Sequence, residues 1–204
     1  MDEKIEISML RDGDTWAARC AKDLLISGTP YRVVIGKEDG TLLYRRDPYA
    51  RHTDYNSTWC FADNPKLFTW SDCGEEAEVY PRSYPPVFDE YVIYELHVGS
   101  FTPEGTFDGA VKRLEHVAKL GFTAIQLMPV AEFADAWGYN PRQLLSVHGP
   151  YGSPTDLRKL VDKAHRSDEL LKWKWRDIWC EGVGGVGEGL KRGSEQWAQG
   201  SEEG

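Results

Sequence analysis

The chain has 204 residues, of which 41% are hydrophobic and 12% aromatic, which is enough to bury one core of ordinary size or two small ones. Its formal net charge of −9 at pH 7 argues against a nucleic-acid partner, because phosphate binding needs a basic face and the longest basic cluster is Arg45-Arg46. No apolar run reaches the roughly 18 residues that a membrane-spanning helix needs, so no membrane partner is expected either.

The cysteines and histidines give no pattern of a metal site. The four cysteines lack CxxC spacing and are expected to be free thiols: Cys20, Cys60, Cys73 and Cys180. His52 and His148 lie near Gly/Pro-rich turns, but only as loose candidates for metal ligands, so we expect neither a metal nor a cofactor. The N-terminus lacks the basic and apolar regions of a signal peptide. We therefore expect a cytoplasmic protein, or a plastid protein if the true N-terminus precedes the printed one.

Residues 1–85 are expected to form part of an immunoglobulin-like β-sandwich. Short β-prone segments at residues 5–10, 31–35 and 41–44 are separated by turn signals such as Asp12-Gly13 and Asp39-Gly40. The proline-rich residues 80–86 then disfavour both a helix and a central strand, which indicates a linker between two domains.

Residues 86–166 show an α/β pattern. A strand is predicted over residues 91–98, a helix from Thr106 to Gly121, and a second strand over 122–128. A long loop over 135–154 precedes a helix that begins at Ser153-Pro154-Thr155-Asp156. Such alternation predicts parallel strands, with functional groups at their C-terminal ends. A complete (β/α)8 barrel takes about 250 residues, so only its first two βα units are visible.

Residues 167–204 form a Trp/Gly-rich tail without helical or strand periodicity, which we expect to be disordered. The run GVGGVGEG lacks the GK[ST] ending of a phosphate-binding loop. The abrupt change of composition after Arg166 is typical of a frameshift, a retained intron or an incomplete gene model.

Three segments carry a family resemblance: VIYELHVGSFTPEGTFDGAVKRLEHVAKLGFTAIQLMPV, then WGYNP, then YGSPTDLRKLVDKAHR. Together they resemble the start of the catalytic barrel of glycoside hydrolase family 13, the α-amylase family, and within it the 1,4-α-glucan branching enzymes and malto-oligosyltrehalose trehalohydrolases. The first region, with Trp16, Gly28-Thr-Pro-Tyr31, Asp47-Pro-Tyr-Ala50 and Phe68-Thr-Trp70, resembles carbohydrate-binding module family 48. The resemblance implies starch or glycogen metabolism, with an α-1,4-glucan as partner.

The resemblance also implies a substrate-binding site in WGYNP. Tyr139 stands at the position of a family tyrosine that packs on the sugar ring, and Trp137 and Asn140 flank it. An aromatic ring can cover the apolar C–H face of a pyranose while polar groups bind its hydroxyls. The alternative is that Trp137, Tyr139 and Tyr151 only pack the loop onto the rim of the barrel.

Several polar residues have simpler interpretations than catalysis. Glu95 and His97 lie on a strand that is mainly scaffold in the family, so a hydrogen-bonded core role is expected for both. Asp156 is interpreted as a helix cap. Glu132 and Asp135 lie near a strand end, but the sequence pairs neither with a partner.

The resemblance places the nucleophile and the general acid of the family on the fourth and fifth barrel strands, whereas this sequence matches only through the second helix. Retaining enzymes need those two carboxyl groups about 5 Å apart. We therefore expect no catalytic residue here and an inactive branching-enzyme-like chain, which associates with itself through an open sheet edge. One alternative is a glucan-binding fragment that uses Trp16, Tyr31, Trp59 and Tyr139, and another is an unstable product.

Overall fold

The computed structural model describes residues 5–21, 23–71, 89 and 91–166. The predicted linker at residues 80–86, the domain boundary at residue 85, the tail at 167–204, Cys73 and Cys180 lie outside the described residues. The chain divides into two compact units, each made of three segments. The first unit comprises residues 1–68, 97–110 and 127–160, and the second comprises residues 69–96, 111–126 and 161–204.

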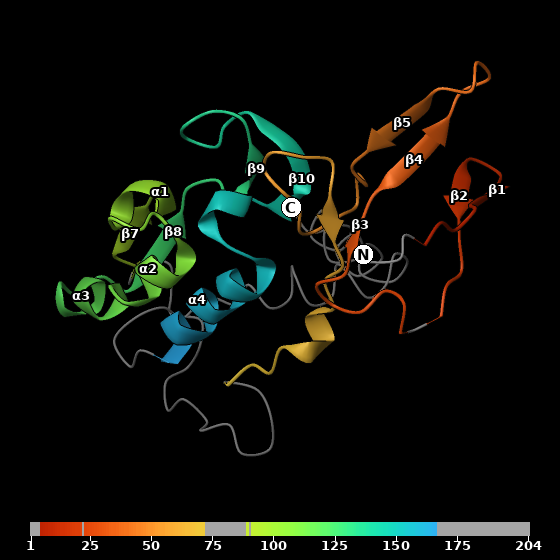
Figure 1. Ribbon diagram of the computed structural model, residues 1–204. Helices are drawn as coiled ribbons and strands as arrows, with labels where there is room; N and C mark the ends of the chain where they lie inside the picture. The colour runs from red at the N-terminus through yellow and green to blue at the C-terminus, as the bar shows by residue number, and fades with distance from the viewer. Residues whose placement is uncertain (1–4, 22, 72–88, 90, 167–204) are drawn as a thin grey trace, which may run out of the picture. The chain divides into compact units, whose positions relative to one another are not determined.

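The N-terminal part of the first unit consists of strand pairs (Figure 1). Strand β1 (Leu10–Asp12) pairs antiparallel with β2 (Thr15–Ala17), β3 (Pro30–Tyr31) with β6 (Cys60–Phe61), and β4 (Val33–Gly36) with β5 (Leu42–Arg45). The short 3₁₀ helix η1 (Pro65–Leu67) follows β6. The two predicted turns are confirmed, with Gly13 at φ +58° and Gly40 at φ +83°, which glycine adopts without steric cost.

The expected β-sandwich is not observed in the described residues. Each sheet in the described part of the chain has only two strands. A sandwich needs two larger sheets packed face to face. The β4–β5 hairpin leaves Val34, Ile35 and Leu42 exposed, so its apolar side chains do not meet a second sheet. Alternation and turn signals predicted the hairpins, because a hairpin depends on neighbouring residues. These signals carry no information on how sheets pack against one another.

The rest of the first unit contains a second antiparallel pair. Strand β9 (Ala131–Phe133) pairs with the longer β10 (Pro141–Val147), with irregular register along β10. The predicted loop over residues 135–154 is therefore wrong in its middle part, which is a strand followed by the 3₁₀ helix η3 (Gly149–Tyr151). The alternation of β10 is obscured by adjacent Leu144 and Leu145, and this hid the strand from the sequence pattern.

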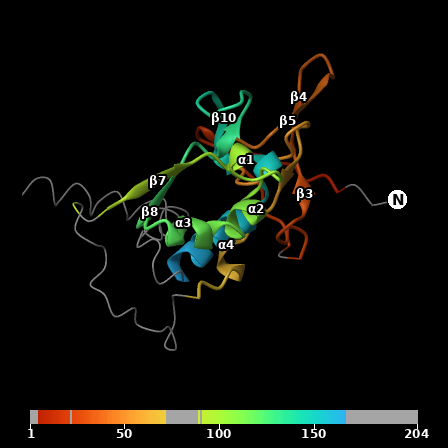
Figure 2. The same cartoon turned by 90° about the vertical axis from the view of Figure 1, so that its left-hand side faces the viewer.

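The second unit contains a strand–helix–strand segment (Figure 2). Strand β7 (Ile93–Leu96) lies beside β8 (Ala124–Leu127), and the Ala124 N–H donates to the Val92 carbonyl. Both strands thus begin at the same end, as parallel strands do. The ring of Tyr94 meets that of Phe122 edge-on at 4.9 Å between centroids.

The predicted helix from Thr106 to Gly121 is interrupted. It forms α2 (Phe107–Val111) and α3 (Leu114–Lys119), with a turn at residues 112–113 between them. A short helix α1 (Val98–Phe101) also takes the end of the predicted first strand. Gly121 ends α3 at φ +86°, as its predicted role of C-terminal cap requires.

The helix α4 (Pro154–Arg166) begins where the sequence predicted. The Asp156 N–H donates to Ser153 Oγ at 3.2 Å, and the Ser153 N–H donates to Asp156 Oδ2 at 3.0 Å. Burial alone would raise the pKa of Asp156, but hydrogen bonds from Lys159 and Ser153 outweigh it and lower that pKa. The expected cap role of Asp156 is confirmed.

Ser153→Ala should destabilise the chain by about 1 kcal/mol, because the first turn of α4 loses its side-chain acceptor. Chemical denaturation followed by circular dichroism measures the change. Ser153→Thr, which keeps the hydroxyl, serves as the control and should retain most of the stability. Equal stability of Ser153→Ala and the unchanged chain would contradict this cap.

Candidate functional site

The tip of the β9–β10 hairpin has a conformation set by two residues. Asp135 Oδ1 accepts hydrogen bonds from the Trp137 N–H at 3.1 Å and the Gly138 N–H at 2.7 Å, which closes a turn. Gly138 has φ +88°, and a Cβ there would lie 2.8 Å from Pro129 Cβ. Only glycine fits this position, so the tip is held in one shape.

This tip exposes the three residues predicted to bind substrate. The Trp137 side chain is 57% exposed and that of Tyr139 is 69% exposed, and Asn140 is exposed beside them. The Trp137 ring lies 4.9 Å from the His97 ring, between centroids. Among the described residues Tyr139 has no hydrogen bond or ring contact, so its ring is accessible to a ligand.

An aromatic cluster next to the hairpin contains the buried Tyr151 and the half-buried His97. Tyr151 is buried, and its ring meets those of Phe107 and Phe133 edge-on. His97 Nε2 hydrogen-bonds the Tyr151 hydroxyl at 2.9 Å, and its Nδ1 hydrogen-bonds Ser100 Oγ at 2.9 Å. His97 makes the expected hydrogen bonds but is half-buried rather than in the core, and the packing role of Tyr151 is confirmed. Glu95 is exposed on β7, so the core role expected for it is wrong.

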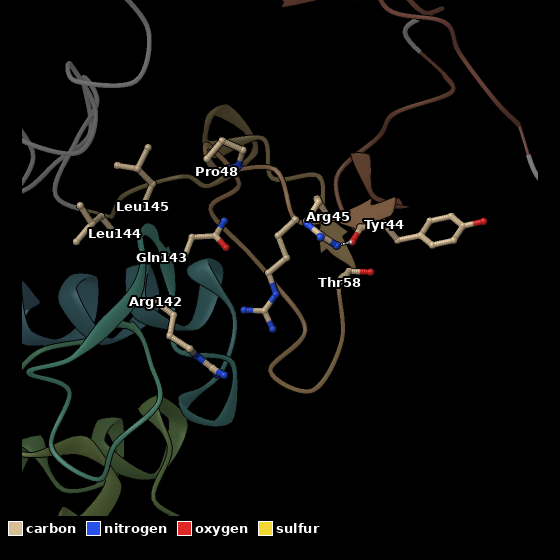
Figure 3. Close-up of a pocket in the computed structure, with 9 residues that line it drawn as sticks. Tyr44, Arg45, Pro48, Thr58, Arg142, Gln143, Leu144 and Leu145 are labelled. Atoms are coloured by element: carbon tan, nitrogen blue, oxygen red, sulfur yellow. Dashed lines mark hydrogen bonds between the residues drawn. The ribbon is translucent and has the colours of Figure 1, made fainter. Parts of the chain in front are cut away.

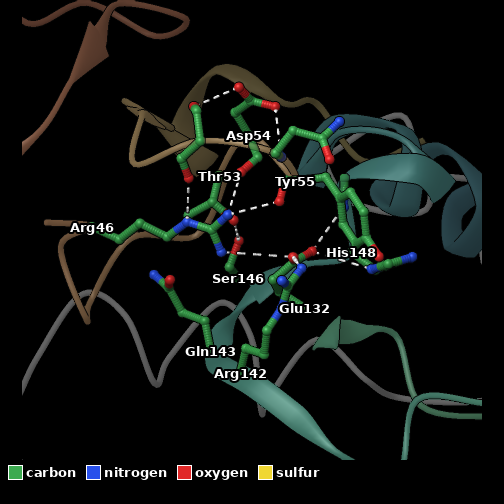
Figure 4. Close-up of polar contacts among 12 residues, drawn as sticks. Arg46, Thr53, Asp54, Tyr55, Glu132, Arg142, Gln143, Ser146 and His148 are labelled. Carbon is green, nitrogen blue, oxygen red and sulfur yellow. Dashed lines mark hydrogen bonds and ion pairs between the residues drawn. The ribbon is translucent and has the colours of Figure 1, made fainter. Parts of the chain in front are cut away.

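Glu132 on β9 has a side chain that is 0% exposed. It lies within a set of polar contacts (Figure 4). Arg142 on β10 donates to Glu132 Oε1 at 2.5 Å, and Arg46 Nη1 lies 3.7 Å from the same oxygen. His148 Nδ1 at 3.1 Å and the Gly149 N–H at 3.3 Å reach Oε2. The sequence interpretation that left Glu132 without a partner is wrong.

Arg46 connects this carboxylate to the N-terminal segment of the same unit. Its guanidinium donates to the backbone carbonyls of Asp54 at 2.6 Å, Tyr55 at 3.0 Å and Ser57 at 2.8 Å. The hydroxyls of Thr53 and Ser146 hydrogen-bond at 2.9 Å close by, and both residues are buried. Residues 46–57 are therefore fixed to the base of the hairpin by buried polar contacts.

His148 packs its ring against Phe133 at 3.7 Å between centroids. Burial lowers the pKa of His148 below its ordinary value of 6.5, and Glu132 offsets only part of that shift. His148 is therefore mainly neutral near pH 7, and Glu132 is balanced chiefly by Arg142 and Arg46.

Arg142 and Gln143 also line a groove of about 730 Å³ (Figure 3). Arg45 and Thr58 lie on one side of it, and Leu144 and Leu145 lie on the other; Arg46 and Pro48 also line it. Gln143, which lines the groove, donates to the Asp47 carbonyl at 2.6 Å. Three arginines line the groove, Arg45, Arg46 and Arg142. Arg46 and Arg142 form ion pairs with Glu132.

The other predicted ligand residues have local roles. His52 packs against Phe61 at 4.8 Å between ring centroids, and burial lowers the pKa of His52. In the part of the chain that the structure describes, no group of three His, Cys, Asp or Glu side chains converges on a common point. Within the same part, no helix has the length and hydropathy needed to span a membrane.

The three aromatic residues proposed to hold a polymer in the N-terminal region differ in accessibility. The Tyr31 hydroxyl donates to Asp47 at 2.8 Å, and burial and this bond raise the pKa of Tyr31. The Arg32 guanidinium lies over the rings of Trp59, at 4.3 Å, and Tyr44, at 3.9 Å. Of these three residues, only Trp16 has a largely exposed ring with no such contact to another described residue.

The strand–helix–strand segment and the hairpin that follows its second strand match solved structures of amylase-type enzymes, which gives the class of protein. A structure from Salmonella typhimurium assigned as an alpha amylase matches 79% of this chain at 34% identity with a TM-score of 0.61. A pullulanase from Bacillus acidopullulyticus shares the fold, with a TM-score of 0.55 at 22% identity. The family model described as alpha amylase, catalytic domain, matches residues 56–170. The chain therefore belongs to the α-amylase family, glycoside hydrolase family 13.

Curated relatives are of two kinds. A malto-oligosyltrehalose trehalohydrolase from Arthrobacter ramosus is 50% identical over 104 residues, and this match covers 50% of the chain and 17% of the relative. A 1,4-alpha-glucan branching enzyme from Streptomyces coelicolor is 32% identical over 163 residues, which covers 76% of the chain and 21% of the relative. The chain thus spans about a fifth of the length of these relatives.

Glu132→Gln should lower the free energy of unfolding by roughly 3–5 kcal/mol, because Arg46 and Arg142 lose their buried counter-charge. Urea denaturation measures the loss. Glu115→Gln is a matched control, since Glu115 pairs with Lys119 on the exposed surface of α3 and should leave stability unchanged. A Glu132→Gln variant as stable as that control would contradict the assigned role.

Stability should fall as pH falls from 7.5 to 5.5. The unfolded chain takes up a proton at His148 near pH 6.5, whereas the folded chain does so only at lower pH, because burial lowers the pKa of His148. His52 acts in the same direction. Denaturation at the two pH values measures the slope, and His148→Gln should reduce it. Stability that is constant or rises on acidification would overturn this assignment.

Proposed function

We propose that this chain supplies the sugar-contacting hairpin of an α-glucan-processing enzyme, with Tyr139 as the ring that packs on a glucosyl unit. The observation that carries the proposal is the exposed ring of Tyr139 on a tip whose backbone is fixed by Asp135 and Gly138. Trp137 extends the aromatic surface, and the Asn140 amide offers a donor and an acceptor to sugar hydroxyls.

The substrate class follows from the chemistry of this surface. A neutral pyranose has apolar C–H faces that a tyrosine ring covers, and hydroxyls that neutral amides and phenols bind. One kind of relative is named for a 1,4-alpha-glucan and the other for a malto-oligosyltrehalose, which supports an α-1,4-glucan such as starch, glycogen or a malto-oligosaccharide. Retaining chemistry needs two carboxyl groups about 5 Å apart. We assign that step to none of the residues described, and the predicted inactivity of the chain stays a prediction.

Two activities remain in competition within the family. A branching-enzyme-like role is our first choice, since the branching-enzyme match extends over 76% of the chain. A trehalohydrolase-like role is the second candidate, because identity to those relatives reaches 50% over the shorter match. Replacing the corresponding segment of each kind of enzyme with residues 89–166 and assaying branching and trehalose release would distinguish them.

Tyr139→Ala should weaken binding of maltoheptaose by about tenfold, because one aromatic contact is worth about 1 kcal/mol or slightly more. Isothermal titration calorimetry measures the affinity. Tyr139→Phe should retain most of it, since the ring remains. Leu144→Ala removes an apolar side chain from β10 that is 77% exposed and should leave affinity unchanged. Unaltered binding by Tyr139→Ala would refute the proposed contact.

A further inference from the structure

The groove lined by Arg142 and Gln143 has the size of a small-molecule site. Its volume of about 730 Å³ falls within the range of about 300–1,000 Å³ that such sites occupy. All of its lining residues belong to the first unit. None of residues 135–140 at the hairpin tip lines the groove, so it is separate from the sugar contact proposed for Tyr139.

An irregularity in β10 supplies one apolar side of the groove. On a regular strand, Leu144 and Leu145 would point to opposite faces of the sheet. Gln143 and Val147 pair with adjacent residues of β9, so β10 carries three extra residues, 144–146, between these two pairs. Leu144 is 77% exposed and Leu145 is 48% exposed, and both line the groove. The bulge thus presents two consecutive leucines to one groove.

The opposite side of the groove offers hydrogen-bond donors (Figure 3). Arg45 is exposed, and its Nη1 donates only to the carbonyl of the adjacent Tyr44, at 2.9 Å. Within the described part of the chain no carboxylate pairs with Arg45, and the Thr58 hydroxyl makes no hydrogen bond. A guanidinium and a hydroxyl therefore lie across from the two leucines with hydrogen bonds still to make.

The lining of the groove is positively charged. It contains three arginines, Arg45, Arg46 and Arg142, and none of the nine described residues that line it is an aspartate or a glutamate. Arg46 and Arg142 share one buried counter-ion, Glu132. Three cations therefore face one carboxylate, in a chain whose formal net charge is −9. This local excess of positive charge favours an anionic ligand.

The two sides of the groove together select an amphipathic anion. A neutral glucan would leave the charge of Arg45 without a partner, and a small hydrophilic anion would leave the leucines exposed to water. A carboxylate matches the fork of N–H donors on a guanidinium, and a hydrocarbon chain attached to it can cover Leu144 and Leu145.

We propose that this groove binds a small aliphatic carboxylate, with the carboxylate on Arg45 and Thr58 and the hydrocarbon chain over Leu144 and Leu145. The site goes beyond the proposed function, because its ligand is an amphipathic anion and not a sugar.

Isothermal titration calorimetry of the full chain with three ligands tests the site. Octanoate should bind at least tenfold more tightly than butyrate, since it carries the same charge and four more methylene groups to bury. The neutral 1-octanol should bind at least fivefold more weakly than octanoate, because it cannot pair with Arg45.

Two variants separate the contributions of charge and apolar surface. Arg45→Gln should weaken octanoate binding at least fivefold and leave 1-octanol binding unchanged. Leu144→Ala should weaken the binding of both ligands about threefold. The matched controls are Arg11→Gln, at an exposed arginine that also donates to a nearby carbonyl, and Leu10→Ala, at a leucine that is likewise 77% exposed. Neither control residue lines the groove, and neither change should alter binding.

Several results would overturn the proposal. Octanoate that binds no better than butyrate, or that equimolar inorganic phosphate displaces, would indicate a site for simple anions. Octanoate affinity that is matched by 1-octanol, or that is insensitive to Arg45→Gln, would show that the charge plays no part. Losses in the two controls as large as those in Arg45→Gln and Leu144→Ala, or no octanoate binding, would reject this groove as the site.

Discussion

The buried carboxylate of Glu132 is the interaction on which the first unit depends. It lies on the short strand β9, and its donors come from β10, from the residues after β10 and from the N-terminal segment. A carboxylate taken out of water is costly unless its oxygens are satisfied. Here both oxygens are, and the same arginine that balances the charge also fixes three backbone carbonyls.

This arrangement explains how a two-stranded hairpin can present aromatic side chains to solvent with a defined geometry. An isolated hairpin is marginally stable in water. The β9–β10 pair is supported at its base by the Glu132 contacts and by Tyr151, which packs on Phe133 and Phe107. At its tip, Asp135 and Gly138 fix the turn. A sugar-binding surface requires exposed rings on a rigid support, which the tip and the base of this hairpin provide.

The sequence predicted the features that depend on neighbouring residues. The Ser153-Pro154-Thr155-Asp156 cap, the turns at Gly13 and Gly40 and the two β-prone segments around residues 94 and 125 were all found because their chemistry is local. The break near Arg113 was missed. The strand β10 was also missed, because Leu144 and Leu145 disturb the alternation that marks a strand.

The Glu132 contacts were missed for a different reason. Arg46 and His148 are brought to Glu132 only by folding, and no spacing rule connects residue 46 with residue 132. One signal was available: a glutamate between Ala131 and Phe133 in an apolar stretch, followed by Arg142, indicates a charge that must find a partner when buried. The family resemblance directed attention to Tyr139 and away from the residue that supports it.

Native-state amide hydrogen exchange on the hairpin tests this account most directly. If Glu132 holds the hairpin, Glu132→Gln should accelerate exchange of the Trp137 and Gly138 amides at the tip and of the β10 amides, under conditions where α3 in the second unit keeps its protection. Exchange at the tip and along β10 that matches the unchanged chain would show that the hairpin does not depend on the buried carboxylate.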